Sequence, residues 1–541
     1  VGNKIKTVSE KGNGEITSDS QVIDAKGKYV LPGLIDMHVH YEDWMPELYL
    51  SHGITTVRDV GNQTEWILAQ RDGINKGKIP GPRIFCSGEL LSCKENIDLP
   101  SWTGWDVWIE SEIRNSDDAK KVAKTLIERG VDLLKIWMGM TPELIKAVAE
   151  EANKAGLPVA GHISISAKDA ALAGVTCLEH STGVTRGTIK DPEKLKRVPE
   201  TEGFDRMTIG GPTHLMEIEN FDELIEILVK NNVSIGPNFT LNGQGISKER
   251  MTKYVMEDRE ILSDPNLQYI PEFFHQWWLY IYYERFYGRD TKKNEEALEG
   301  YRKHEEFIRR FHKAGGKIFA ESDAPNVTPG ISLYRELDMM VEAGFSNNDA
   351  ILFATRNAAE VLVKIDEMGT VEKNKLADII IIQGNPLQDI SSVRNVDTVI
   401  KDGKVIEIGY HANFTNPIPR LPNTEVHGFM LPSVTSIDPI SCLEGDKDVH
   451  MAVDGTGFTT RSVARFDGMG VPTKFINPTK IEAIIPEYLL KRVGTFSVTV
   501  TNPPPLQIRE QIYVTQGPSS WSSRTSIENS QNTKFFIVKF K

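Results

Sequence analysis

The chain has 541 residues, which is too long for one ordinary domain, so we expect two or three domains. Its composition, 40% hydrophobic and 25% charged, is typical of a soluble globular protein, and no apolar run has the length of a membrane span. The net charge of −13 argues against nucleic acid and anionic membrane surfaces as partners.

The first 30 residues read as short strands and turns, which are too few to bury a core of their own. We therefore expect them to pair with strands from elsewhere in the chain. The chain opens at Val1 with neither a methionine nor a signal-type apolar segment, so we expect it to be trimmed or incomplete at this end.

Short apolar strands alternate with longer amphipathic segments over residues 31–365, which indicates a parallel α/β fold. One helix is predicted over Pro142–Ala155, because Thr141 can cap its start and Gly156 can end it. Eight strand–helix units in succession favour a (β/α)8 TIM barrel over an open sheet. The expected strands are Gly33–His40, Thr55–Val60, Arg83–Glu89, Leu133–Trp137, Pro158–Ser164, Cys177–Ser181, Ser234–Thr240 and Lys317–Asp323.

Two further regions differ in pattern from the barrel. Residues 242–300 are rich in aromatic residues and read either as a helical insertion packed on the barrel or as a lid over its mouth. Residues 366–414 return to a β pattern, and we predict that they join residues 1–30 in a small composite β-sandwich built from both chain ends.

The C-terminal part of the chain has the pattern of a separate unit. Residues 415–423 read as a linker, since Asn416–Pro422 holds three prolines. Residues 424–541 contain short alternating strands and predict an all-β immunoglobulin-like sandwich.

Polar side chains stand near the C-terminal ends of the predicted barrel strands, where barrels place catalytic groups. His38 and His40 end the first strand and share one face, so the two imidazoles are placed to hold one metal ion. Each polar residue taken alone also reads as an ordinary core residue, but their recurrence at successive strand ends favours one joint site. The others are Lys135, His162, His180 and Asp323.

Lys135 lies in an apolar strand, where an unpaired charge would be costly. One interpretation is that its amine reaches into the barrel mouth. The other is that a depressed pKa lets the amine react with CO₂, which gives a carbamate, an anionic oxygen ligand able to bridge two cations.

These motifs resemble the amidohydrolase superfamily, within the subset related to imidazolonepropionase and the metal-dependent Xaa-Pro dipeptidases. The matching motifs lie between residues 1 and 415 and are Pro32-Gly-Leu-Ile-Asp-Met-His-Val-His40, Gly53-Ile-Thr-Thr-Val-Arg-Asp-Val60, Gly81-Pro-Arg83, Asp132-Leu-Leu-Lys-Ile136, Gly161-His162, Glu179-His180, Ser322-Asp-Ala324, Ala354-Thr-Arg-Asn-Ala-Ala359 and Gly384-Asn-Pro386. The resemblance implies a barrel capped by the composite sandwich, a binuclear metal centre, and first strands that precede Val1. The C-terminal unit is similar to IPT/TIG domains, which are usual in exported or surface proteins; the localisation otherwise stays open.

The resemblance also implies a role for each residue. It implies that His38, His40 and Asp323 hold one ion, that His162 and His180 hold a second, and that a carboxylated Lys135 bridges them. Two cations about 3.5–4 Å apart would share a hydroxide that attacks an amide carbonyl, with Asp323 as general acid and base. Zinc suits these nitrogen and oxygen ligands, although such sites accept other divalent ions.

The chain departs from these relatives at two places. Relatives often have Gly-Thr where this chain has Glu321-Ser322, and many peptidase relatives have histidine at the position of Tyr334. Both departures leave the ligand set intact and leave the substrate open. Candidate substrate-binding residues are Arg186 for a carboxylate, Tyr41 for a carbonyl, and Tyr334.

We therefore predict a metal-dependent hydrolase of amide C–N bonds that acts on a small molecule or short peptide, such as a dipeptide or N-acyl amino acid. A cyclic amide, imide or ester substrate stays open, as does a non-catalytic binding or adhesion protein that works through the C-terminal sandwich. Lys135 disfavours a mononuclear deaminase, since a bridging ligand serves two ions. Arg58 is expected to have a structural role, such as pairing with Asp59. No nucleic-acid partner is expected, and assembly into a homo-oligomer stays open.

Overall fold

The computed structural model describes residues 2–10, 18, 20–93, 111–198, 211–271, 274–275, 278, 286–287, 289–418, 432–459, 462–501 and 534–539. The chain divides into two compact units. The first comprises Val1–Asp98, Trp108–Ile246 and Lys292–Pro419, and the second comprises Leu99–Val107, Ser247–Thr291 and Arg420–Lys541. No helix in the described ranges is both long and apolar enough to cross a membrane.

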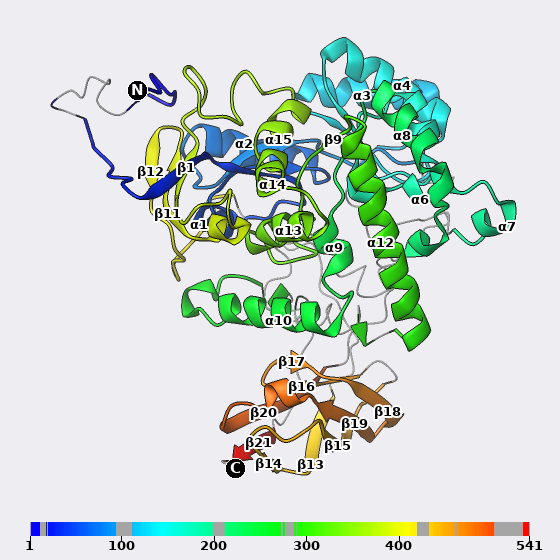
Figure 1. Cartoon of the computed structure of the whole chain (residues 1–541), viewed down its shortest axis with the longest axis vertical. Coiled ribbons are helices and arrows are strands. Elements are labelled where there is room, and N and C mark those ends of the chain that lie inside the picture. Colours follow the sequence, from blue (N-terminus) through cyan, green and yellow to red (C-terminus); the bar gives the residue numbers. More distant parts are fainter. Residues whose placement is uncertain are drawn as a thin grey trace. The chain divides into compact units, whose positions relative to one another are not determined.

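The first unit contains two parallel sheets (Figure 1). A three-stranded sheet is formed by β2 (Leu34–Val39), β3 (Ile54–Asp59) and β4 (Arg83–Cys86). A five-stranded sheet is formed by β5 (Leu134–Ile136), β6 (Val159–Gly161), β7 (Cys177–Leu178), β8 (Ser234–Ile235) and β9 (Lys317–Ile318). These eight strands occupy the eight predicted positions in the predicted order.

The two sheets do not form one continuous closed barrel, so the expected eight-stranded barrel is present only in part. Isolated parallel bridges link their edges, between Leu91 and Ile136 at one seam and between Val39 and Ala324 at the other. At each seam a single bridge stands in place of a continuous ladder. The strands β7, β8 and β9 pair with one another within one sheet but have only two residues each, because the chain leaves the extended conformation soon afterwards. His180 and Asp323, which follow β7 and β9, have left-handed φ values of 54° and 66°.

Helices follow most of the strands, as expected for a parallel α/β fold. In Figure 1, α3 (Ser116–Arg129), α4 (Pro142–Ala155) and α8 (Phe221–Lys230) lie beside the five-stranded sheet; α3 packs on α4, α4 on α5 (Ala167–Ala173) and α5 on α8. The remaining helices of this unit are α1 (Pro46–Ser51), α2 (Thr64–Asn75), α6 (Val184–Thr188), α7 (Pro192–Leu195), α9 (Phe239–Gly243), α12 (Thr291–Lys313), α13 (Ile331–Glu342), α14 (Asn347–Phe353) and α15 (Arg356–Val361).

The bounds of α4 agree with the prediction because both of its ends are set locally. The Thr141 hydroxyl accepts a hydrogen bond from the N–H of Leu144, and Pro142 occupies the first turn, where no backbone donor is needed. Gly156 ends the helix at a left-handed φ of 68°, a conformation that glycine adopts without steric cost.

Both ends of the first unit meet in a four-stranded antiparallel sheet of β1 (Lys28–Pro32), β10 (Ile379–Gln383), β11 (Val396–Lys401) and β12 (Lys404–Ile406), in that order. Lys28 pairs with Gln383 and Pro32 with Ile379, so residues from opposite ends of the unit share one ladder. Lys4 makes an isolated bridge to Leu376. The first strand of the parallel sheets thus begins directly after a strand that the far end of the unit holds in place.

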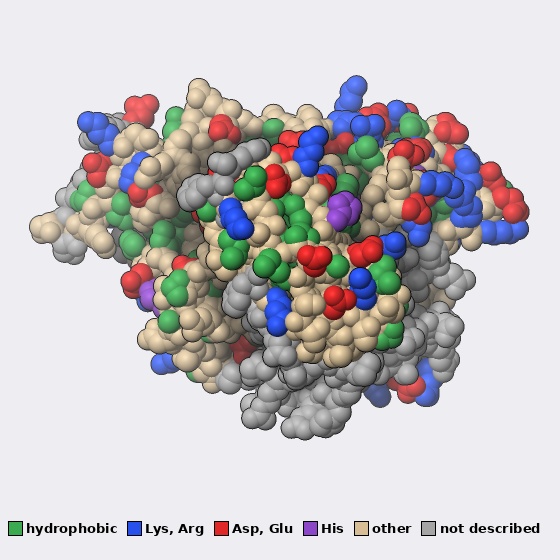
Figure 2. Space-filling model, turned by 90° about the horizontal axis from the view of Figure 1, so that it is seen from below, with side chains coloured by type: hydrophobic (Ala, Val, Ile, Leu, Met, Phe, Trp, Pro, Cys, Tyr) green, Lys and Arg blue, Asp and Glu red, His purple; other side chains and the backbone are tan. Residues whose placement is uncertain are grey.

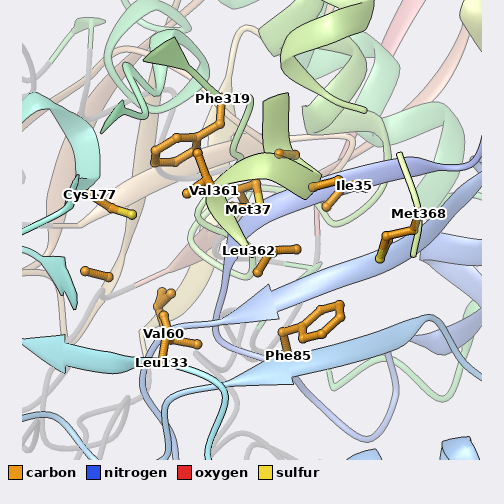
Figure 3. Close-up of a cluster of buried hydrophobic side chains, with 13 residues drawn as sticks. Ile35, Met37, Val60, Phe85, Leu133, Cys177, Phe319, Val361, Leu362 and Met368 are labelled. Carbon is orange, nitrogen blue, oxygen red and sulfur yellow. The ribbon is translucent and has the colours of Figure 1, made fainter. Parts of the chain in front are cut away.

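One apolar cluster spans both parallel sheets and α15 (Figure 3). It includes Met37 from β2, Phe85 from β4, Phe319 after β9 and Leu362 at the end of α15. Burial of a side chain of this size contributes about 1.5–3 kcal/mol. Because strands from both sheets share this core, the cluster holds the two sheets together although their ladders are interrupted.

The second unit contains a two-sheet β-sandwich. One sheet has the order β13 (Ser433–Asp438), β15 (Val449–Thr456), β19 (Lys480–Ile485), β18 (Thr473–Asn477). The other has the order β14 (Ser441–Leu443), β21 (Lys534–Lys539), β20 (Gly494–Thr501), β16 (Val463–Phe466), β17 (Met469–Gly470). The rings of Phe466, Phe496 and Phe536 pack together inside it, with centroids 5.0 and 5.7 Å from that of Phe466.

Part of the aromatic-rich insertion belongs to the same unit as this sandwich. Helix α10 (Lys248–Leu262) contacts the turn before β17, where Arg259 forms an ion pair with Asp467. The rings of Phe274 and Trp278 are fully buried and lie 5.6 Å apart. Five further aromatic residues of the insertion lie outside the described residues, namely Phe273, Trp277, Tyr280, Tyr282 and Tyr283.

Acidic and basic side chains are interspersed on the face drawn in Figure 2, and hydrophobic side chains form separate small groups there. The negative net charge is therefore not gathered into one acidic area on this face.

Candidate metal centre

His38 and His40 both point toward the carboxylate of Asp323. They lie at the end of β2 and just beyond it, and both are buried. The Nε2 atoms of His38 and His40 lie 3.5 and 3.6 Å from Oδ1 of Asp323. The alternation of side chains along β2 puts both imidazoles on one face, and the hydrogen bond from the Asp323 N–H to the His38 carbonyl fixes the adjoining segment.

His180 approaches the same carboxylate from β7. Its Nε2 lies 3.8 Å from Oδ2 of Asp323, and its ring centroid lies 4.2 Å from that of His38. His180 and Asp323 both have left-handed backbone conformations, which cost of order 1–3 kcal/mol for residues other than glycine. Such strain is common at functional sites, and here it turns both side chains toward the end of β2.

The Nδ1 atoms of the three histidines each have an oxygen partner on the opposite side of the ring. His38 Nδ1 lies 2.6 Å from Oε2 of Glu179, and His40 Nδ1 lies 3.0 Å from the carbonyl oxygen of Gly61. His180 Nδ1 lies 3.1 Å from Oε1 of Glu321. A proton held on Nδ1 by an acceptor leaves the Nε2 lone pair free, which is the usual arrangement around metal-binding histidines.

Lys135 and His162 lie in the same region and carry buried nitrogen atoms without hydrogen-bond partners in the described part of the chain. Lys135 Nζ lies 4.0 Å from Oε2 of Glu179, and the His162 ring centroid lies 5.5 Å from that of His180. Burial lowers the pKa of both groups. Because an orphaned buried nitrogen is costly, a cation at His162 Nε2 and a modification of Lys135 Nζ would each satisfy an unmet need.

A buried ion pair lies beneath the histidines. Arg58 on β3 donates from Nη2 to both oxygens of Glu179, at 2.7 and 2.8 Å, and all of these groups are fully buried. The expected pairing of Arg58 with Asp59 is therefore wrong: adjacent strand residues face opposite ways, and Asp59 instead accepts the N–H of Tyr41. Desolvation is the largest single effect on Glu179 and opposes its charge, but Arg58, Lys135 and His180 together outweigh it and lower the pKa of this carboxyl.

Three acidic residues of this site were not among the predicted site residues. Glu179 precedes His180, and Glu321 lies two residues before Asp323. Asp36 lies two residues before His38 on the same strand face, and its carboxylate accepts the hydroxyl and the N–H of Ser322 at 2.6 and 3.0 Å. Burial raises the pKa of Asp36 to about 7. The one signal that could have identified these residues is their spacing from the predicted ligands.

The candidate substrate residues contact other parts of the fold. Tyr41 is fully buried and stacks on Tyr49, and burial raises the pKa of its phenol. Tyr334 donates its hydroxyl to the carbonyl of His52 at 2.6 Å. Arg186 on α6 donates to the carbonyl of Val198. Each therefore has a structural contact, and none of their described hydrogen bonds reaches His38, His40, His162 or His180.

Comparison with known proteins adds a family to this geometry. Residues 29–406 match the amidohydrolase family, and residues 432–517 match the IPT/TIG domain. This chain belongs to the amidohydrolase family. The match covers the elements that supply His38, His40, Lys135, His162, His180 and Asp323.

Solved structures of amidohydrolases have the same fold. A Xaa-Pro dipeptidase with bound methionine is 24% identical, with a TM-score of 0.51 over 75% of this chain and 93% of that one. Phenylurea hydrolase B is 20% identical, with a TM-score of 0.53 over 75% and 91%. Molinate hydrolase is 21% identical, with a TM-score of 0.52 over 75% and 89%. At this level of identity the likeness shows the fold and not the substrate.

The curated sequence relatives of this amidohydrolase align with a smaller part of the chain than the solved structures do. An uncharacterised protein of Mycobacterium tuberculosis is 26% identical over 184 residues, which are 30% of this chain and 47% of that protein. The chain thus spans about half the length of the relatives of this group. A dihydroorotase of Trichlorobacter lovleyi is 62% identical over 37 residues, which are 7% of this chain and 9% of that enzyme.

The donor set of this amidohydrolase fits divalent cations. Ligand atoms of His38, His40 and Asp323 lie within 4.8 Å of one another, and so do those of His38, His180 and Glu321. Imidazole nitrogen and carboxylate oxygen are ligands that zinc accepts. In the second set, Glu321 lies beside the Nδ1 atoms of His38 and His180, and these atoms face away from Asp323. The set of His38, His40 and Asp323 is therefore the better candidate.

Proposed function

We propose that this protein is a metal-dependent hydrolase that cleaves an amide C–N bond in a dipeptide or an N-acyl amino acid. The observation that carries the proposal is the convergence of three imidazole Nε2 atoms on the carboxylate of Asp323, with every Nδ1 atom beside an oxygen acceptor. A cluster of buried histidines without a cation would gain nothing from this shared orientation.

We infer that two ions are held, both most suitably zinc. His38, His40 and Asp323 would hold one, His162 and His180 the other, and a carboxylated Lys135 would lie between them. Cations at such a site polarise a carbonyl and lower the pKa of water. Carboxylation would replace the orphaned amine of Lys135 by an anion beside the histidines, which suits its position on the buried face of β5.

Asp323 has the role of proton carrier in this proposal. One of its oxygens accepts a proton from the attacking water as the new C–O bond forms at the amide carbon. The same carboxyl then donates that proton to the departing nitrogen as the C–N bond breaks, so that one water is consumed and an acid and an amine are released. The left-handed backbone at Asp323 and its hydrogen bond to the His38 carbonyl fix this carboxyl relative to the histidines.

The preference for a dipeptide or N-acyl amino acid is supported by the sequence motifs that resemble those of the metal-dependent Xaa-Pro dipeptidases. Two competing substrate classes, cyclic amides or imides and esters, would use the same site with the same proton transfer. The non-catalytic alternative, binding through the C-terminal sandwich, does not account for the ordered histidine rings.

The decisive experiment combines metal analysis with a substrate screen. Purified protein should contain close to two divalent ions per chain, and the zinc-loaded protein should hydrolyse members of a library of dipeptides and N-acyl amino acids. Asp323→Asn should abolish hydrolysis. Asp378→Asn, in a buried carboxylate that pairs with Arg83 away from the histidines, should retain it. Protein that folds, binds no metal and turns over no amide, imide or ester would overturn the proposal.

A further inference from the structure

The carboxyl of Glu321 lies beside the rings of two of the site histidines. Glu321 follows β9 and is fully buried. Its Oε1 lies 3.1 Å from Nδ1 of His180, and its Oε2 lies 3.6 Å from Nδ1 of His38. Nδ1 of His38 has its hydrogen bond with Glu179, whose charge also acts on Glu321. One carboxyl therefore connects rings that come from β2 and from the turn after β7.

The backbone of His180 depends on the same carboxyl. Oε1 of Glu321 accepts the N–H of His180 at 3.0 Å, and this is the partner that the N–H has among the described residues. His180 is held in the left-handed region, where a residue with a side chain is strained. Glu321 thus fixes both the main chain and the ring of His180, and the two contacts together define the direction of Nε2.

The neighbouring strand leaves room for this side chain. A Cβ atom at Gly236, just after β8, would overlap the carboxyl of Glu321 and the ring of Phe319. The carbonyl of Gly236 also accepts the N–H of Ser181 at 3.2 Å. The glycine on one strand end and the glutamate on the next are therefore complementary, and both bear on the turn that carries His180.

A second polar group lies near the same ring nitrogen. The amide nitrogen of Asn238 lies 2.9 Å from Nδ1 of His180. An amide NH₂ can donate only to an unprotonated Nδ1, and that tautomer would place a hydrogen on Nε2, on the side of Asp323. A carboxyl oxygen accepts from a protonated Nδ1 and leaves the Nε2 lone pair exposed. The two neighbours thus favour opposite tautomers, and only Glu321 favours the one that can bind a cation.

We propose that Glu321 is a positioning residue that orients His180, and with Glu179 also His38, so that their Nε2 atoms face the metal position beside Asp323. This inference rests on the proposed function. The partner of a metal-binding histidine typically contributes about 10–100-fold to metal affinity.

The test measures metal binding rather than hydrolysis. Metal-free protein is titrated with Co²⁺, and the visible absorption of the bound ion reports its coordination. Glu321→Met keeps the side-chain length and removes both oxygens, so it should lower Co²⁺ affinity about 10–100-fold and change the spectrum. Glu321→Gln keeps an acceptor oxygen and should bind Co²⁺ with nearly the affinity and spectrum of the wild type. Glu217→Gln, a buried glutamate that pairs with Lys194 elsewhere in the first unit, is the matched control and should match the wild type.

The outcomes separate the two proposals. If the wild type binds Co²⁺ and Glu321→Met binds it with equal affinity and an equal spectrum, Glu321 has no positioning role while the proposed function stands. If Glu321→Gln is as weak as Glu321→Met, charge rather than orientation is responsible and the inference fails. If the wild type binds no divalent ion, both proposals fail. Should Glu321→Met not fold, Glu321→Asp takes its place: it keeps the charge but withdraws the oxygens, and it must weaken binding for the inference to hold.

Discussion

Replacement of Arg58 by methionine tests whether the buried ion pair beneath the histidines is as tightly coupled as its geometry indicates. Methionine keeps much of the volume and removes the charge and all donors. Glu179 would then lose both hydrogen bonds from Nη2 and remain fully buried. Truncation of one partner of such a buried pair costs about 3–5 kcal/mol, because the other charge is left uncompensated.

The structure also sets a limit to this cost and gives it a pH dependence. Without Arg58, we expect desolvation, the largest effect on Glu179, to prevail over Lys135 and His180 and to keep its carboxyl protonated in the folded state, whereas in the unfolded state it ionises with a pKa of 4.5. At pH 7, which is 2.5 pH units above that value, keeping the carboxyl protonated costs about 3.4 kcal/mol. The folded variant binds more protons than the unfolded chain above pH 4.5, so its stability rises as the pH falls. At pH 5 the same term is about 0.7 kcal/mol.

The assay is urea unfolding of the metal-free protein at pH 7 and pH 5. At pH 7, Arg58→Met should be less stable than the wild type by about 3–5 kcal/mol. At pH 5 this loss of stability should be smaller by about 2.7 kcal/mol. Glu179→Gln added to Arg58→Met should recover part of the loss and remove the pH dependence. Arg71→Met is the control, since its partner Asp132 is 25% exposed and can be hydrated. A loss at pH 7 below about 1 kcal/mol, or one that does not shrink at pH 5, would contradict tight coupling of the pair.

Three further predictions address other parts of the chain. Burial lowers the pKa of His304 to about 4 from an unfolded value of 6.5, so the unfolded state binds more protons between these two pH values. The free energy of unfolding should therefore fall by up to about 3 kcal/mol as the pH drops from 6.5 to 4. Urea unfolding of His304→Gln should lack this contribution to the pH dependence. Tyr334→Phe leaves the His52 carbonyl without its donor and should cost about 1–2 kcal/mol of stability, with KM unchanged; a raised KM at full stability would instead support a substrate role. Phe466→Ala opens the sandwich core and should lower the stability of the second unit by about 3–5 kcal/mol, yet calorimetry should find the metal affinity unchanged, because every candidate ligand lies in the first unit.

Features with local causes could be predicted from the sequence. The helix at Pro142–Ala155 has its cap, its first-turn proline and its terminal glycine in adjacent positions, and the structure has the same bounds. The eight parallel strands could be located because each is a short apolar run between polar segments. The sequence also placed His38, His40, His180 and Asp323 at or after the ends of predicted parallel strands, and in the structure these side chains lie close together although their strands belong to two sheets.

Features that depend on distant residues could not be predicted. Arg58 has an acidic neighbour in sequence, but its partner Glu179 is 121 positions away, and nothing in the local pattern distinguishes the two. The assignment of α10 to the unit of the sandwich depends on contacts such as Arg259 with Asp467, which link the insertion to the C-terminal part of the chain. In each case the determining interaction joins segments whose separate patterns carry no sign of it.

The short lengths of β7, β8 and β9 and the geometry of the candidate site have one physical cause. A continuous ladder needs extended backbone, and extended residues alternate their side chains between two faces. β7 ends two residues before His180 and β8 three residues before Asn238, and both of these residues have left-handed φ values, as Asp323 has after β9. Leaving the ladder frees the backbone to turn His180 and Asp323 toward the end of β2 and Asn238 toward His180, which extended strands could not do. The hydrogen bonds lost from the ladder are replaced in part by side chains, such as Glu321 at the N–H of His180. A barrel with complete strands at these positions would therefore lose the arrangement of ligands that the proposed function requires.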